Sequence, residues 1–113
     1  MQAFEIADLL RALDRRGHVY EEFLRVEELS VGLARWPAGS VDDQTPHTED
    51  EVYYVVAGQA RIRVGGEERP VRPGSIVYVP ADVEHHFHGI SGDLEVLIFW
   101  APPRRSRRTG SRT

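Results

Sequence analysis

The feature that most constrains this chain is a regular succession of short runs rich in Val, Ile, Tyr and Phe, beginning near residue 20. Turn signals built from Gly, Pro, Asp and Ser separate these runs at a spacing of about 8–12 residues. Such spacing is typical of an antiparallel sandwich or barrel. The predicted strands cover residues 19–26, 29–36, 51–56, 60–64, 75–79, 84–89 and 94–100.

Two of the predicted strands carry further information. Residues 60–64 alternate strictly, so Arg61 and Arg63 are predicted to face outward, and the Gly65-Gly66 pair after them predicts a two-residue hairpin turn. Residues 94–100 are apolar at nearly every position, which indicates that both faces of the last strand are covered. One face would belong to the core and the other to a subunit interface.

The two ends of the chain differ from this β-rich body. Apolar side chains recur at helical spacing within residues 3–15, which predicts a short helix in an N-terminal segment, residues 1–18. The length of 113 residues suits one domain, which we place at residues 19–103. Residues 104–113 contain five arginines and no acid and are predicted to form a basic disordered tail.

Charge and composition exclude several classes of function. The five arginines of the tail leave nine arginines against 18 acidic residues in the rest of the chain, so the folded body is acidic and repels phosphate backbones. A nucleic-acid role is therefore disfavoured. The absence of cysteine excludes disulfides, thiolate metal ligands and a cysteine nucleophile. No apolar stretch has signal-peptide or membrane-spanning length, so we expect a cytoplasmic protein without a membrane partner.

Four of the five histidines fall in two short segments. In the first, every second residue from 45 to 51 shares one face if the strand is unbroken, which places His47 and Glu51 together. Pro46 and the β-prone run that follows favour an extended segment over a helix. In the second, alternation puts His85 and Phe87 on one face and His86 and His88 on the other. At most two of these three histidines can therefore belong to one site.

Both histidine segments lie within longer spaced patterns. The first pattern consists of Gly39, Thr45, His47, Glu51 and Gly58, at the spacing G-x5-H-x-H-x3-E-x6-G, with Thr45 in place of the first histidine. The second consists of Gly74, Pro80, Asp82, His85 and Gly89, at the spacing G-x5-P-x-G-x2-H-x3-N, with Asp82 in place of glycine and Gly89 in place of asparagine. With these two patterns the chain resembles the cupin superfamily, and most of all the small single-domain bacterial cupins.

The resemblance implies both a fold and a ligand set. The fold is all-β, the cupin double-stranded β-helix or jelly-roll barrel, here with a short N-terminal helix. The implied metal ligands are His47, Glu51 and His85, and the resemblance denies this role to His86 and His88. Two imidazoles and one carboxylate suit a divalent ion such as Fe, Mn, Ni or Zn, with coordination positions left open for water, dioxygen or a substrate.

Several points about the site stay open at this level. Thr45 is a poor ligand, and either Gln44 or Glu49 could take the place of the missing histidine. Tyr53 and Phe87 lie on the same strand faces as the implied ligands Glu51 and His85, so they either line a ligand pocket or pack in the core. The alternative to a metal site is a set of polar groups that satisfy one another. The acidic residues of this region are expected in a solvated loop; they are Asp42, Asp43, Glu49 and Asp50.

The fold implies function poorly, because one scaffold carries many activities. The first hypothesis is a metal-dependent enzyme, oxygenase-like and most simply a dioxygenase, acting on a small polar molecule. A sugar-isomerase-like cupin would use the same open positions without redox chemistry. A non-catalytic module that binds or senses a small molecule is the rival from another class, and a structural protein acting through its last strand and tail is a third. The expected assembly is a homodimer.

Overall fold

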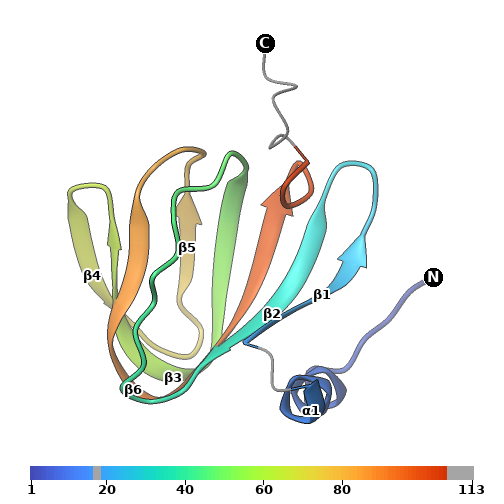
Figure 1. The fold of residues 1–113 in the computed structure, drawn as a ribbon, viewed down its shortest axis with the longest axis horizontal. Coiled ribbons are helices and arrows are strands. Elements are labelled where there is room, and N and C mark those ends of the chain that lie inside the picture. Colours follow the sequence, from blue (N-terminus) through green and yellow to red (C-terminus); the bar gives the residue numbers. More distant parts are fainter. Residues whose placement is uncertain (17–18, 107–113) are drawn as a thin grey trace.

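Six strands and one helix form the part of the chain that the computed structural model describes, residues 1–16 and 19–106. The strands pair antiparallel in the order β1-β2-β6-β3-β4, and β5 pairs with β3 (Figure 1). This architecture confirms the predicted all-β barrel with a short N-terminal helix. The elements are α1 (Ile6–Arg16), β1 (Tyr20–Arg25), β2 (Ser30–Trp36), β3 (Asp50–Val64), β4 (Glu67–Val71), β5 (Ile76–Val79) and β6 (His85–Ala101).

Two long strands replace four predicted short ones. The predicted strands 51–56 and 60–64 are halves of β3, and the predicted strands 84–89 and 94–100 are halves of β6. The pairing of β3 with β6 shifts register between Val55 and Arg61, and both strands bend at the base of the view in Figure 1. The glycines that predicted turns therefore make bulges at a barrel corner.

Gly58 shows why the corner requires glycine. Its φ is +85°, which L side chains rarely adopt. A Cβ atom on Gly58 would also collide with the backbone of Asp93 and Leu94 on the neighbouring strand β6. The close approach of β3 and β6 at this point lets both strands continue round the corner. Gly58, which by sequence predicts a turn, therefore lies at a bend within β3.

The hairpin after β3 has the predicted turn but adds a strand that sequence reasoning missed. Gly65 and Gly66 form the turn, and Val64 pairs with Glu67 across it. Arg61 and Arg63 are exposed, as predicted. The return strand β4 reads Glu-Glu-Arg-Pro-Val, a composition that gives no strand signal; its charges and its proline are typical of a sheet edge.

Helix α1 lies beside the base of β1, outside the sheet (Figure 1). Its spaced apolar residues give it one buried face, and Leu13 is fully buried. An ion pair between Asp14 and Arg35 ties the helix to β2, and Arg35 also pairs with Glu95 on β6. The helix therefore packs beside β1 and is joined to the sheet by this ion pair.

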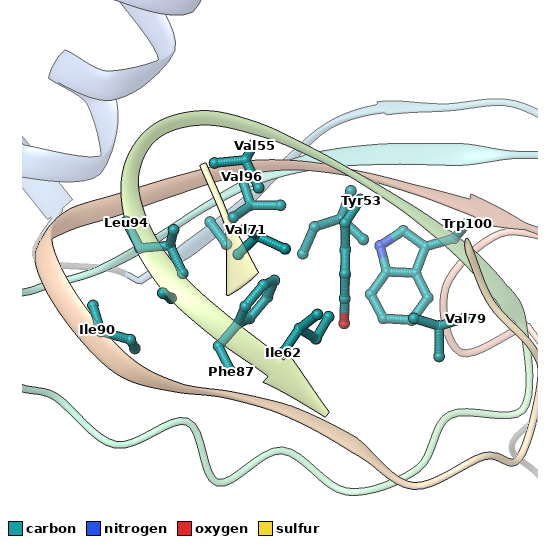
Figure 2. Close-up of a cluster of buried hydrophobic side chains, with 13 residues drawn as sticks. Tyr53, Val55, Ile62, Val71, Val79, Phe87, Ile90, Leu94, Val96 and Trp100 are labelled. Atoms are coloured by element: carbon teal, nitrogen blue, oxygen red, sulfur yellow. The ribbon is translucent and has the colours of Figure 1, made fainter. Parts of the chain in front are cut away.

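The interior is filled by the alternating inward side chains of β3, β6 and their neighbours. Figure 2 shows side chains from β3 and β6 pointing into one shared core, among them Tyr53, Phe87 and Trp100. On β3 the inward positions after Asp50 begin with a carboxylate, Glu51, before the apolar series starts at Tyr53. One end of the interior is thus polar.

Two expectations fall outside the residues that the structure describes, the helix stop at Gly17 and most of the predicted tail, residues 107–113. None of the helices among the described residues is long and apolar enough to cross a membrane.

Candidate metal centre

Three side chains from separate parts of the chain meet at the polar end of the interior. Glu51 is the second residue of β3, His85 is the first residue of β6, and His47 lies in the irregular segment before β3. Each offers one ligand atom, and these atoms all lie within 4.8 Å of one another. His85 Nε2 is 3.2 Å and His47 Nε2 is 3.9 Å from Glu51 Oε2.

The environment of His85 determines which ring nitrogen faces the site. Its Nδ1 lies 2.8 Å from the carbonyl oxygen of Val83. Because a carbonyl can only accept a hydrogen bond, Nδ1 carries a proton, and in its neutral form the ring presents the lone pair of Nε2 to Glu51. A lone pair facing a carboxylate is repulsive unless a proton or a cation lies between them.

Several polar atoms here are buried without a partner. Within the described residues, both carboxylate oxygens of Glu51, His85 Nε2 and the hydroxyl of Tyr53 have no hydrogen-bond partner. Glu51 and His85 are 1% and 2% exposed. Orphaned buried polar atoms are rare in native proteins and call for an explanation such as an ion. The donor set of two imidazoles and a carboxylate fits a divalent transition metal.

The pKa shifts follow from burial and from neighbouring charges. Burial lowers the pKa of His47, and the nearby His85 and Arg104 lower it further against the opposing effect of Glu51. Burial by itself lowers the pKa of His85, but the Glu51 carboxylate and the Val83 carbonyl outweigh it, so the net pKa is raised. Burial raises the pKa of Tyr53 well above its usual value, with a further contribution from Glu51.

Gln44 reaches the site from the segment before His47. Its Oε1 lies 3.0 Å from His47 Nε2, and its Nε2 donates a hydrogen bond of 2.8 Å to Asp42 Oδ2. Since a carboxylate can only accept, the amide orientation is set by Asp42, with the oxygen toward His47. The same carboxylate accepts a hydrogen bond from the backbone N–H of Phe87. Asp42 thus holds the Gln44 segment against β6.

The other sequence candidates lie elsewhere. Thr45, at the position of the missing histidine, is exposed. Glu49 is buried and accepts a hydrogen bond from Thr48, and it is not among the three residues whose ligand atoms converge. Tyr53 and Phe87 are both fully buried, and their rings contact each other at 5.1 Å between centroids. His86 and His88 lie on the opposite face of β6 from His85, and His88 pairs with Glu68.

The acidic residues of this region correct one expectation. A solvated loop was predicted for Asp42, Asp43, Glu49 and Asp50, but Asp42 and Glu49 are 7% and 2% exposed. Asp42 is buried because backbone and side-chain N–H groups satisfy it. Sequence reasoning missed that Asp42 positions Gln44. The signal in the sequence was the spacing of two residues between them, which lets an aspartate accept a hydrogen bond from the backbone N–H of Gln44.

Sequence reasoning also missed the residues beside His47 that border the site, which are Trp100, Tyr20 and Arg104. Trp100 contacts His47 edge to face, with 4.7 Å between ring centroids, and its indole N–H donates to the hydroxyl of Tyr20. Burial raises the pKa of Tyr20 to about 12. A cavity of about 170 Å³ opens beside His47 and is bordered by both aromatic residues and by Arg104. The sequence analysis placed the two faces of residues 94–100 in the core and at an interface, which left the contact of Trp100 with His47 unseen.

Comparisons with known proteins agree with the sequence patterns. The family model described as "Cupin domain" matches residues 32–102. A Streptomyces coelicolor protein, the uncharacterized protein SCO3923, is 48% identical over 103 residues, which are 91% of this chain and 98% of that protein. The match extends over nearly the whole of both chains.

Two solved structures illustrate the likeness in three dimensions. KdgF from a Halomonas species has a TM-score of 0.69 and 22% identity, over 75% of this chain and 78% of that chain. The DMSP lyase DddQ from Ruegeria pomeroyi DSS-3 has a TM-score of 0.65 and 25% identity, over 74% of this chain and 42% of that chain. At such identities the likeness to KdgF shows the fold alone.

Proposed function

The chain belongs to the cupin family, and from this premise we propose that it is a metal-dependent enzyme that acts on a small polar molecule, with His47, Glu51 and His85 holding a divalent ion. The observation that carries the proposal is the convergence of these three ligand atoms around orphaned buried polar groups. An ion at this place would satisfy Glu51 and His85 together, and its charge would offset that of the buried carboxylate.

The distances support the same reading. Two atoms that each lie about 2.1 Å from one ion stand roughly 3 Å apart at right angles and about 4.2 Å apart on opposite sides. His85 Nε2 to Glu51 Oε2, at 3.2 Å, and His47 Nε2 to Glu51 Oε2, at 3.9 Å, fall within these bounds. Both pairs that include Glu51 therefore match ligands of one shared ion, and the ligand atoms of His47 and His85 lie within 4.8 Å of each other.

We propose Gln44 as the residue that replaces the missing histidine of the first pattern. Its Oε1 lies 3.0 Å from His47 Nε2, the separation expected of adjacent ligands, and Asp42 orients it. Amide oxygens are weaker ligands for transition metals than imidazoles, so this position would exchange more readily for water or substrate.

A bound ion of this kind supplies Lewis acidity and, if it is iron, redox chemistry with dioxygen. The chain's own groups prepare the site for it. Val83 orients His85, Asp42 orients Gln44, and the ring of Trp100 shields His47 from solvent. The oxygenase hypothesis rests on the donor set of two histidines and one carboxylate, which would leave coordination positions open on a bound ion.

A non-catalytic binding module is the second candidate. It is favoured by the exposed Thr45 at the position where the family pattern has a histidine, because a weaker centre suits ligand capture better than turnover. DddQ is a DMSP lyase by name, so lyase chemistry is a further reaction class to consider for this fold.

The homodimer also stays a prediction. Exposed apolar side chains on neighbouring strands offer a surface for it on the outer face of the sheet, at Tyr54, Ile76, Tyr78 and Phe99.

The test begins with elemental analysis of protein purified without chelator, for wild type and for the double variant His47→Ala, His85→Ala. We expect about one divalent ion per chain in the wild type and none in the double variant. Stoichiometric iron with oxygen uptake on small hydroxy or keto acids supports the oxygenase. A metal-loaded protein that turns over none of them supports the binding module, and absence of metal from both proteins contradicts the proposal.

A further inference from the structure

Arg104 holds a defined place although the sequence assigned it to the tail. It lies three residues after the end of β6, and its backbone N–H donates a 2.8 Å hydrogen bond to the hydroxyl of Ser30 on β2. Its carbonyl oxygen accepts a 3.0 Å hydrogen bond from the guanidinium of Arg25, at the end of β1. Two neighbouring strands therefore fix the backbone from which the side chain extends.

The guanidinium of Arg104 lies on an aromatic platform. Its Cζ atom is 4.8 Å from the ring centroid of Tyr20 and 5.3 Å from that of Trp100. The hydrogen bond of 2.9 Å between Trp100 and Tyr20 holds these two rings in place. Stacking on aromatic faces uses the flat face of a guanidinium, whereas its N–H donors lie in the plane and point outward from the edge.

Arg104 borders the same cavity as His47, one of the three proposed metal ligands. This cavity, of about 170 Å³, is lined by Tyr20, Trp100 and Arg104 together with His47 and Gln44. At roughly 30 Å³ for each water, it has room for about five or six waters or one small organic molecule. Such a molecule could reach the open side of the metal centre and the guanidinium at once.

The charges around the cavity select its ligand. A divalent ion held by two neutral imidazoles and Glu51 leaves a net charge of +1, and Arg104 adds another. Two carboxylates also line the cavity: Asp42 accepts hydrogen bonds from the side-chain amide of Gln44 and the backbone N–H of Phe87, and Asp43 is exposed. An anion would therefore bind toward the side formed by Arg104 and the metal centre.

We infer that this cavity is a binding site for a small carboxylate-bearing molecule, with Arg104 pairing with a carboxylate while another oxygen of the molecule reaches the metal centre. The inference rests on the proposed function and names the substrate class of that site. A guanidinium matches the two oxygens of a carboxylate with parallel N–H donors, which fixes orientation as well as charge. The aromatic walls leave space for only a short carbon skeleton.

Calorimetry with malonate on zinc-loaded protein tests the inference. We expect Arg104→Gln to weaken malonate binding about 10- to 100-fold, because a charge-assisted pair is lost. Arg104→Lys should restore only part of the affinity, since an ammonium lacks the planar fork. The matched control is Arg105→Gln, which removes the same charge from the exposed neighbouring residue and should bind malonate like wild type.

Further measurements distinguish carboxylates from other ligands, and distinguish failure of this inference from failure of the proposed function. Malonamide, a neutral analogue, should bind far more weakly than malonate, and tighter binding of inorganic phosphate than of malonate would overturn the assignment to carboxylates. Zinc content is measured for every variant and should not change in Arg104→Gln. Normal zinc content with unchanged malonate affinity in Arg104→Gln overturns this inference alone. If wild type takes up no zinc, the proposed function fails, and malonate titration of the metal-free protein still shows whether binding depends on Arg104.

Discussion

The two ends of the barrel interior are built from the same strands, yet they hold opposite kinds of side chain. At the apolar end, Val55, Leu94 and Val96 are all completely buried and pack against one another in one cluster. At the polar end, Glu51 and His85 are buried to the same degree but leave polar atoms without partners. The apolar end stabilises the fold, whereas the polar end is destabilising unless a ligand completes it.

The largest effect should come from removing the charge at the polar end. Glu51→Gln keeps the size of the side chain but removes its negative charge, so we expect affinity for Zn²⁺ to fall by about a thousandfold or more, roughly 4 kcal/mol. In the presence of chelator the same variant should unfold at the same temperature as wild type or higher, because a buried charge without a hydrogen bond has been removed. Calorimetric titration and thermal unfolding measure the two effects.

The matched control is Glu49→Gln, which changes a second buried carboxylate only two residues away. Glu49 accepts a hydrogen bond from Thr48 and lies outside the converging ligand atoms, so its variant should bind Zn²⁺ as wild type does. Loss of metal in Glu49→Gln with retention in Glu51→Gln would reverse the assignment of the carboxylate ligand.

A change at the apolar end should do the opposite, lowering stability without affecting metal binding. Leu94→Ala removes a fully buried side chain, and the resulting cavity should lower the free energy of unfolding by about 2–5 kcal/mol. Urea denaturation measures the loss, and metal content at low temperature should equal that of wild type. The volume-conserving Leu94→Met should cost less than about 1.5 kcal/mol. Metal loss in the folded Leu94→Ala variant would show that the two ends are not separable.

Substitution of Gln44 tests whether the metal centre at the polar end has a fourth ligand besides His47, Glu51 and His85. We expect Gln44→Ala to weaken Zn²⁺ binding about 10- to 100-fold and Asp42→Asn to have a smaller effect, because it weakens the hydrogen bonds that position Gln44 without removing the proposed ligand. Thr45→Ala is the control, since Thr45 is exposed and should contribute nothing. Equal affinities in Gln44→Ala and wild type would limit the centre to His47, Glu51 and His85.

Tyr53 lies where the two ends meet and should give the smallest effect. Its ring packs against Phe87, whereas its hydroxyl is buried without a partner. Tyr53→Phe keeps the ring, so we expect the metal-free protein to gain up to about 1 kcal/mol of stability in urea denaturation. A loss of more than about 1 kcal/mol would instead show that the hydroxyl makes a stabilising hydrogen bond in solution.

Sequence reasoning succeeded where a pattern is local. The alternation of strands predicted that His85 and Phe87 share a face and that Arg61 and Arg63 point outward, because side chains of a strand alternate whatever the fold around it. The ligand set His47, Glu51 and His85 is what the resemblance to the cupin superfamily implies, and it stays a prediction until metal is measured.

The same reasoning failed where the outcome depends on a neighbouring strand. Gly58 reads as a turn residue, and only the close backbone of Asp93 on β6 makes it a bend within β3. The charged strand β4 forms because the Gly65-Gly66 turn returns it to β3, since its own composition carries no strand signal.

The sequence by itself determined the family, the barrel and which side chains of a strand share a face, because the period of a strand and the spacing of motif residues are properties of the chain. Only the tertiary structure decided that Asp42 is buried, that Gln44 turns its oxygen to His47, and that Arg104 stacks beside the site. These contacts join irregular segments to distant strands. No local periodicity encodes such contacts, since they depend on how the barrel closes around its polar end.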